Sequence, residues 1–253
     1  MHDIKINKTF FQICINLNDD DPDIHTCRKK LLEMNPGWDY LCITSQDQFK
    51  QLMQQHFGDS SDPFFNTIHA AFNEIPNVVG PSHKQHKVAE DQKKHVHDVC
   101  KLVSQTDLFR LAMIYKFGGV YFDMSSRLQL DISTISDKYN CCVVKSPAEV
   151  RTSFLYAVKN NRVVRRLLDF VINNVLVKRV GNQVALAGPG AWTAAFDTSI
   201  SPGDIKYNFA KVFEENTSET TWWTMDAPWK QSLHTPSKIN PAKKINTHWN
   251  FEY

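Results

Sequence analysis

The sequence has little net charge and no long apolar run, and both absences narrow the class of protein. With 29 basic and 27 acidic residues among 253, the formal net charge is only +2, so no global field would drive non-specific binding to nucleic acid. No stretch approaches the roughly eighteen consecutive apolar residues that a membrane-spanning helix needs. Positions 1–17 also lack the continuous apolar stretch of a signal peptide, because polar residues interrupt them. We therefore expect a soluble protein with no nucleic-acid partner and no transmembrane segment.

The cysteines lack the spacing of a zinc site or of a redox pair. No C-x-x-C motif occurs among the six, which are Cys14, Cys27, Cys42, Cys100, Cys141 and Cys142. This usage favours buried, reduced thiols and an anchor-free or cytoplasmic protein, with the lumen of the secretory pathway as the open alternative. A group of four histidines at 83, 86, 95 and 97 lacks Cys or Asp partners at fixed spacing, so we interpret it as surface histidines.

The first sixty residues alternate between strand and helix patterns. A β-branched and aromatic run at 9–15 precedes a helix that begins at Pro22, and a second such run at 38–44 precedes a helix capped by Ser45 and Gln48. Alternation with short connections predicts an α/β, Rossmann-like fold, in which helices flank a mainly parallel central sheet. The glycine fingerprint G-x-G-x-x-G is absent. No repeat or linker divides residues 1–253, which predicts a single domain.

Further along the chain, a helix and a strand meet at a glycine pair. The pattern predicts a helix from Thr106, as its cap, to Phe117, a reversal at Gly118-Gly119, and a short strand that ends at Asp123. The stretch 58–103 has no clear pattern beyond a helical one at 69–74. After the reversal we expect a strand at 141–144, a helix at 163–177, an apolar segment at 184–187 and a helix at 191–196.

Three charged side chains belong to this helix and strand. Asp107 and Arg110 lie three residues apart on one helical face, and such a pair can both accept hydrogen bonds from and donate them to a polyol. An ordinary ion pair within the helix is the alternative. Asp123 ends an apolar strand, where open α/β sheets place ligand groups, and its carboxylate could hold Mg²⁺ or Mn²⁺. The alternative for Asp123 is a turn cap with Ser125 and Ser126.

The whole string TDLFRLAMIYKFGGVYFDMS resembles the core motif of glycosyltransferase family 32, the sugar transferases with a DXD motif. The matching positions are Asp107, Arg110, Tyr115, Gly118, Gly119, Tyr121 and Asp123. The resemblance implies a GT-A fold and transfer of a sugar from a nucleotide-diphospho-sugar, UDP- or GDP-linked, to a hydroxyl of a glycan or glycoconjugate acceptor. It also implies a divalent cation, Mn²⁺ or Mg²⁺, and retention at the anomeric carbon. The nucleotide-sugar core would then span about 8–145 and the acceptor portion about 146–253.

The resemblance also assigns roles to single residues. It implies that Asp107 and Arg110 hold donor-sugar hydroxyls, that Asp123 holds the cation or the ribose, and that His248 holds the cation or the diphosphate. The implied donor-binding set further includes Tyr115, Gly118, Gly119, Tyr121, Gly188, Gly190 and Trp249. One position departs from the family, because Ser125 stands where the second Asp of the motif is ordinarily the metal ligand. The implied metal set is therefore Asp123, Ser125 and His248.

Two other functions remain open at this point. Because of Ser125, the chain could be a catalytically inactive relative that binds a sugar nucleotide or a glycan without turnover. A strand that ends Asp-x-Ser also loosely resembles phosphatases that form an aspartyl-phosphate, in which Asp123 would be the nucleophile. Those enzymes normally have a second Asp at the position of Ser125, and they leave Asp107 and Arg110 unexplained.

Overall fold

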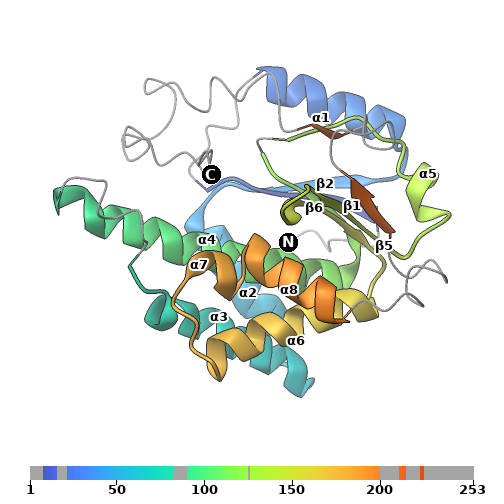
Figure 1. Ribbon diagram of the computed structural model, residues 1–253. Coiled ribbons are helices and arrows are strands. Elements are labelled where there is room, and N and C mark those ends of the chain that lie inside the picture. The colour runs from blue at the N-terminus through green and yellow to red at the C-terminus, as the bar shows by residue number, and fades with distance from the viewer. Residues whose placement is uncertain are drawn as a thin grey trace.

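A six-stranded mixed sheet forms the centre of the computed structural model, which describes residues 8–15, 22–81, 90–124, 126–199, 211–214 and 223–224 (Figure 1). The strand order is β2-β1-β3-β6-β5-β7. Parallel pairing joins β1 to β2, β1 to β3 and β5 to β7, whereas β6 runs antiparallel to both β3 and β5. The mainly parallel α/β arrangement predicted from the sequence is therefore confirmed.

The strands of this sheet are β1 (Thr9–Ile13), β2 (Asp39–Ile43), β3 (Gly119–Phe122), β5 (Cys141–Lys145), β6 (Val150–Ala157) and β7 (Lys211–Glu214). The helices are α1 (Pro22–Met34), α2 (Gln46–Phe57), α3 (Pro63–Val78), α4 (Glu90–Phe117), α5 (Ser133–Ser136), α6 (Arg162–Leu176), α7 (Gln183–Leu186) and α8 (Pro189–Ser199). A separate pair is formed by β4 (Arg127–Leu128) and β8 (Trp223–Thr224).

Helices cover both faces of the sheet. Figure 1 shows α2, α3, α4, α6, α7 and α8 on one face, with α1 and α5 on the other. The alternation of side chains along β3 separates two cores, since Tyr121 packs with the large helical layer while Val120 and Phe122 pack on the α1 face with Leu31. The end of β3 therefore lies between two well-packed layers, and its position is fixed from both sides.

The helix that carries Asp107 is much longer than the sequence pattern suggested. Thr106 was expected to cap a helix, but it lies inside α4, which begins at Glu90. The expectation was wrong because the charged stretch before Thr106 hides a buried stripe, formed by Val96 and Cys100 four residues apart. The Thr106 hydroxyl instead donates to the Val103 carbonyl in the preceding turn.

The predicted reversal after α4 is confirmed. The helix ends at Phe117, and Gly118 and Gly119 both have positive φ, 77° and 107°. At Gly118 a Cβ atom would lie 2.8 Å from the backbone nitrogen of Lys159, so the position needs glycine both for its backbone angle and for space. The chain thus enters β3 within two residues of leaving the helix.

Local signals near the other helices are mostly confirmed. Ser45 caps α2 by accepting a hydrogen bond from the Gln48 nitrogen, although the Gln48 side chain accepts from the Thr44 nitrogen, one residue before the position expected for a capping box. Asn161 caps α6, whose bounds are within one residue of those predicted. The unclear middle stretch forms α3, capped by Asp62, and the first part of α4.

None of the six cysteines forms a disulfide in the structure. Cys100, Cys141 and Cys142 are buried, as expected, whereas the other three are partly exposed. Within the described part of the chain, no helix is both long and apolar enough to cross a membrane.

Candidate functional site

Three charged side chains converge where α4 passes the end of β3. Arg110 NH2 lies 2.9 Å from Asp107 Oδ1, one turn earlier on the helix, and Arg110 NH1 lies 3.1 Å from Asp123 Oδ1. The side chains of Asp107 and Arg110 are 4% and 7% exposed, whereas that of Asp123 is 30% exposed. The guanidinium therefore joins a buried carboxylate to one that reaches the surface.

Further contacts fix the orientation of the Arg110 guanidinium. NH1 also donates to the backbone carbonyl of Thr152 on β6 at 2.7 Å, and the guanidinium carbon lies 4.4 Å from the centre of the Tyr121 ring. The Tyr121 hydroxyl donates to Asp123 Oδ1 at 2.5 Å. Arg110 and Tyr121 both donate to Oδ1, and the other carboxylate oxygen, Oδ2, accepts no hydrogen bond from the described residues.

Burial shapes the charges of this network. Desolvation raises the pKa of the Asp107 carboxyl to about 7, despite the opposing effect of Arg110 and with a further increase from Asp123. Burial alone would lower the pKa of Arg110, but Tyr121, Asp107 and Asp123 together raise it, so the guanidinium stays charged. Burial also raises the pKa of Tyr121, which keeps its hydroxyl protonated as a donor. The network thus centres on a permanent cation with carboxyl groups on both sides.

The backbone of Asp123 is held by Ser153 and Gln12, which the sequence patterns did not single out for the site, and by Ser126, which was named in the turn alternative. Its nitrogen donates to the Ser153 carbonyl on β6 at 3.0 Å, and its carbonyl accepts from the Ser126 nitrogen at 2.9 Å and from the Gln12 side-chain amide at 3.3 Å. Gln12 is buried on β1, the strand next to β3. The run of residues with high β propensity at 150–157 was the sequence signal for β6, which brings Thr152 and Ser153 to the site.

The structure brings some of the predicted residues together and places others elsewhere. Tyr115 lies near the C-terminal end of α4, where its ring contacts those of Phe64 and Phe65. Gly188 and Gly190 pack against Val184 of α7, since a Cβ atom on either would lie 3.2 Å from Val184 backbone atoms. Gly190 lies inside α8 and not in a loop before it, because that helix begins at Pro189, a residue favoured in the first helical turn.

The remaining predicted residues, Ser125, His248 and Trp249, lie outside the described residues. Within the described ranges, no three His, Cys, Asp or Glu side chains are grouped as a metal site would require. Asp131, the nearest alternative carboxylate along the chain, instead accepts hydrogen bonds from the nitrogen and hydroxyl of Ser133 at the start of α5. At the end of β3 the described residues therefore offer a cation one partly exposed carboxylate, Asp123, and do not by themselves fit a metal centre.

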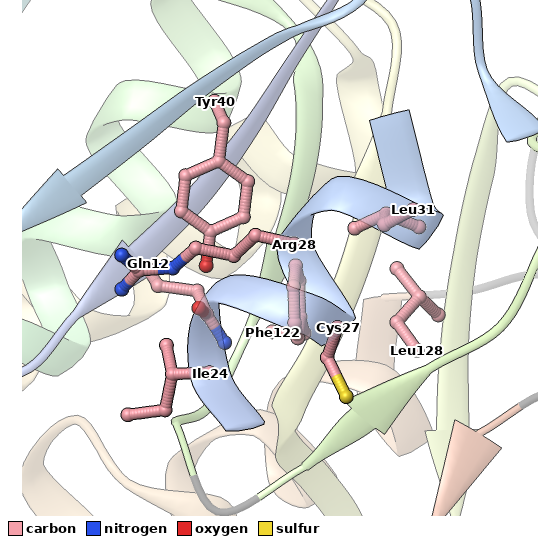
Figure 2. A pocket seen from close by; sticks show the side chains of 8 residues that line it. All are labelled: Gln12, Ile24, Cys27, Arg28, Leu31, Tyr40, Phe122 and Leu128. Carbon is pink, nitrogen blue, oxygen red and sulfur yellow. The ribbon is translucent and has the colours of Figure 1, made fainter. Parts of the chain in front are cut away.

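A small cavity lies behind the site, on the α1 face of the sheet (Figure 2). Its volume is ≈ 10 Å³, enough for about one water molecule. The lining residues are Gln12, Ile24, Cys27, Arg28, Leu31, Tyr40, Phe122 and Leu128. Gln12 connects this cavity to the Asp123 carbonyl through the sheet. The cavity is far too small for a nucleotide or a sugar.

Comparison with known proteins gives one family match and several structures of similar fold. Residues 21–142 match the family described as "Glycosyltransferase sugar-binding region containing DXD motif". No curated protein is significantly similar to the chain. Similar solved structures include "PaToxG Glycosyltransferase", with 18% identity, a TM-score of 0.49, and coverage of 94% of this chain and 82% of that chain.

Two further structures are of the glycosyltransferase domain of the YGT toxin, one ligand-free and one bound to UDP. Their TM-scores are 0.47 and 0.46, and in both the identity is 9%, with coverage of 89% of this chain and 82% of that chain. At these values the likeness assigns no ligand to this chain. The matched family region contains Asp107, Arg110 and Asp123 and supports an enzyme of the glycosyltransferase class. It does not distinguish family 32 from other transferases that share the sugar-binding region.

Proposed function

We propose that the protein transfers a sugar from a nucleotide-diphospho-sugar donor to a hydroxyl of a glycan or glycoconjugate acceptor. The observation that carries the proposal is the Asp123 carboxylate, which is held on Oδ1 by Arg110 and Tyr121 and is exposed at the end of β3. This is the edge of an α/β sheet at which ligands bind. The match to a sugar-binding glycosyltransferase region includes this strand end.

In this proposal Asp123 is the residue that contacts the donor. Its Oδ2 accepts a hydrogen bond from a hydroxyl of the ribose or of the sugar, a charge-assisted contact that is stronger than a neutral one. Arg110 and Tyr121 keep the carboxylate in one orientation, so little reorganisation is needed when the donor binds. The acceptor hydroxyl attacks the anomeric carbon on the face from which the nucleoside diphosphate departs. The diphosphate leaves with the bonding electron pair, and a phosphate oxygen takes up the proton that the acceptor hydroxyl loses.

Asp107 acts through Arg110 in this account, because only 4% of its side chain is exposed. The resemblance to family 32 implies instead that Asp107 and Arg110 contact hydroxyls of the donor sugar directly. Because both side chains are buried, we favour a role in which they hold the Asp123 carboxylate in one orientation. Direct contact with the donor would require the Arg110 bridge to open, and that would leave a buried carboxylate without its cation.

Cation dependence and retention of anomeric configuration complete the proposal, on the basis of the resemblance. A divalent ion bound with the donor would neutralise charge on the departing diphosphate. Asp123 would supply the carboxylate ligand of this ion, and the sequence suggests Ser125 and His248 as its other ligands. A serine hydroxyl is a weaker ligand than a carboxylate, so Ser125→Asp should tighten Mn²⁺ binding, which titration calorimetry measures. No change in affinity would show that position 125 does not face the cation.

A catalytically inactive relative is the second candidate, favoured by Ser125 at the position of the motif's second Asp. Such a protein would bind a sugar nucleotide without turnover. Incubation with UDP-glucose, UDP-galactose, UDP-N-acetylglucosamine and GDP-mannose, in the presence of Mn²⁺, separates the two candidates. Release of nucleoside diphosphate supports the transferase, whereas calorimetric binding without release supports the inactive relative. The absence of both binding and release for every donor contradicts both.

A further inference from the structure

Ser153 lies directly across from Asp123 in the sheet. The antiparallel ladder pairs Phe122 with Phe154, and the hydrogen bond from the Asp123 nitrogen to the Ser153 carbonyl, 3.0 Å, continues it by one pair. Directly opposed residues of an antiparallel pair project from the same face of the sheet, with their Cβ atoms about 5 Å apart. Ser153 therefore shares the face of Asp123 and Tyr121, and Phe154 lies on the opposite face with Phe122.

The Ser153 hydroxyl has no hydrogen-bond partner among the described residues, although the residue is only 5% exposed. A buried hydroxyl without a partner is costly and rare in native proteins, and functional sites are among the few places where such groups are kept. The backbone on both sides of Ser153 is firmly held. Arg110 NH1 binds the Thr152 carbonyl, and the Phe154 side chain packs in the core of the α1 face. The orphan hydroxyl is therefore a property of the site and not of a loose strand.

We propose that Ser153 is a second sugar-recognition residue of the donor site, whose hydroxyl pairs with a hydroxyl of the donor sugar bound at Asp123. This inference rests on the proposed function and names a residue that selects the sugar. The serine hydroxyl can occupy three staggered positions about χ1, and the Cβ atoms of directly opposed residues lie about 5 Å apart, which brings this hydroxyl within reach of a ligand hydroxyl at Asp123. A hydroxyl both donates and accepts, which matches the hydroxyls of a sugar.

A sugar hydroxyl fits this position better than a cation does. A serine hydroxyl carries no negative charge, and hard divalent cations prefer carboxylates, so a cation bound with the donor has Asp123 and not Ser153 as its ligand. A sugar hydroxyl is neutral and can both accept a hydrogen bond from the Ser153 hydroxyl and donate one to it, which satisfies the orphan group.

The test compares Ser153→Ala with Thr9→Val. Thr9 is fully buried, and its hydroxyl also lacks a partner in the part of the chain that the structure describes. Thr9 lies at the opposite end of the same sheet, since β1 and β3 run parallel from Thr9 and Gly119. Each substitution removes one unsatisfied hydroxyl, so both variants should keep or slightly raise the melting temperature. Calorimetry then measures affinity for whichever of the four donors named above binds the wild type, and for its free nucleoside diphosphate.

We expect Ser153→Ala to bind the donor about five- to tenfold more weakly while its affinity for the free nucleoside diphosphate is unchanged. Thr9→Val should match the wild type for both ligands. Unchanged donor affinity in Ser153→Ala overturns the role of Ser153 but leaves the proposed function intact. An equal loss for donor and free nucleotide also overturns it, because the hydroxyl would then not recognise the sugar. If the wild type binds no donor, the proposed function fails and this inference fails with it.

Discussion

Arg110 and Asp123 are thirteen residues apart in the chain, yet their side chains lie 3.1 Å apart across the turn between α4 and β3. The contact depends on the Gly118-Gly119 reversal, which returns the strand along the helix. Through this contact Arg110 links a buried carboxyl group, that of Asp107, to a partly exposed one, that of Asp123. The predictions below follow from this arrangement.

Removal of Arg110 should destabilise the fold and not only weaken donor binding. Arg110→Ala leaves the Asp107 carboxylate buried without its cation, which costs about 3–5 kcal/mol in comparable sites. Urea unfolding measures the loss. Lys29→Ala is the control, because Lys29 pairs with Glu33 on an exposed face of α1 and its removal should cost less than about 1 kcal/mol. Equal, small effects of the two substitutions would show that the Arg110 network is not a buried ion pair.

The Asp107 carboxyl should make stability depend on pH. Its pKa is raised from 3.8 to about 7 in the folded state, so the folded protein binds this proton more tightly than the unfolded chain does. The associated stability is complete below about pH 4 and is lost as the pH rises toward 7. Asp107→Asn cannot ionise, so the free energy of unfolding of the wild type should fall relative to that of the variant across this range. A difference that stays constant from pH 4 to 7 would contradict the shift.

Gly118 should tolerate alanine less well than Gly37 does. Both residues have positive φ, 77° and 81°, so alanine at either is strained by about 1–2 kcal/mol. A Cβ at Gly37 has nothing within 4 Å, whereas one at Gly118 would lie 2.8 Å from the Lys159 nitrogen. Thermal unfolding of Gly118→Ala and Gly37→Ala should therefore show a clearly lower melting temperature for the first. Equal melting temperatures would mean that the close approach to Lys159 relaxes without cost.

The convergence of Asp107, Arg110 and Asp123 could be predicted from the sequence because every step is local. Helical spacing puts Asp107 and Arg110 on one face, and the glycine pair reverses the chain at once. Their burial could not be predicted in this way, since it depends on helices and strands packed from distant parts of the chain. The alternative of an ordinary ion pair within the helix described their direct contact correctly but not the shared contact with Asp123.

The contributions of β1 and β6 to the site were not predictable from local patterns. Ser153 reaches Asp123 only because β6 inserts antiparallel between β3 and β5, and Gln12 reaches it because β1 neighbours β3. The pairing of β3 with β6 and with β1 joins segments that are distant in the sequence, so no residue spacing predicts it. The sequence pattern did not predict that α4 begins at Glu90, for a different reason. The few buried positions in the first part of this helix lie among charged residues, and such a pattern is typical of a solvent-exposed segment.

The most direct measurement compares Asp123→Asn with Asp169→Asn in the release of nucleoside diphosphate from a donor that the wild type uses. Asparagine keeps an oxygen for Arg110 and Tyr121 but removes the charge that faces the ligand, whereas Asp169 lies on the surface of α6, paired with Arg165. We expect Asp123→Asn to lose at least about a hundredfold in rate with an unchanged melting temperature, and Asp169→Asn to match the wild type. Wild-type turnover in Asp123→Asn would contradict the assignment of this strand end as the site.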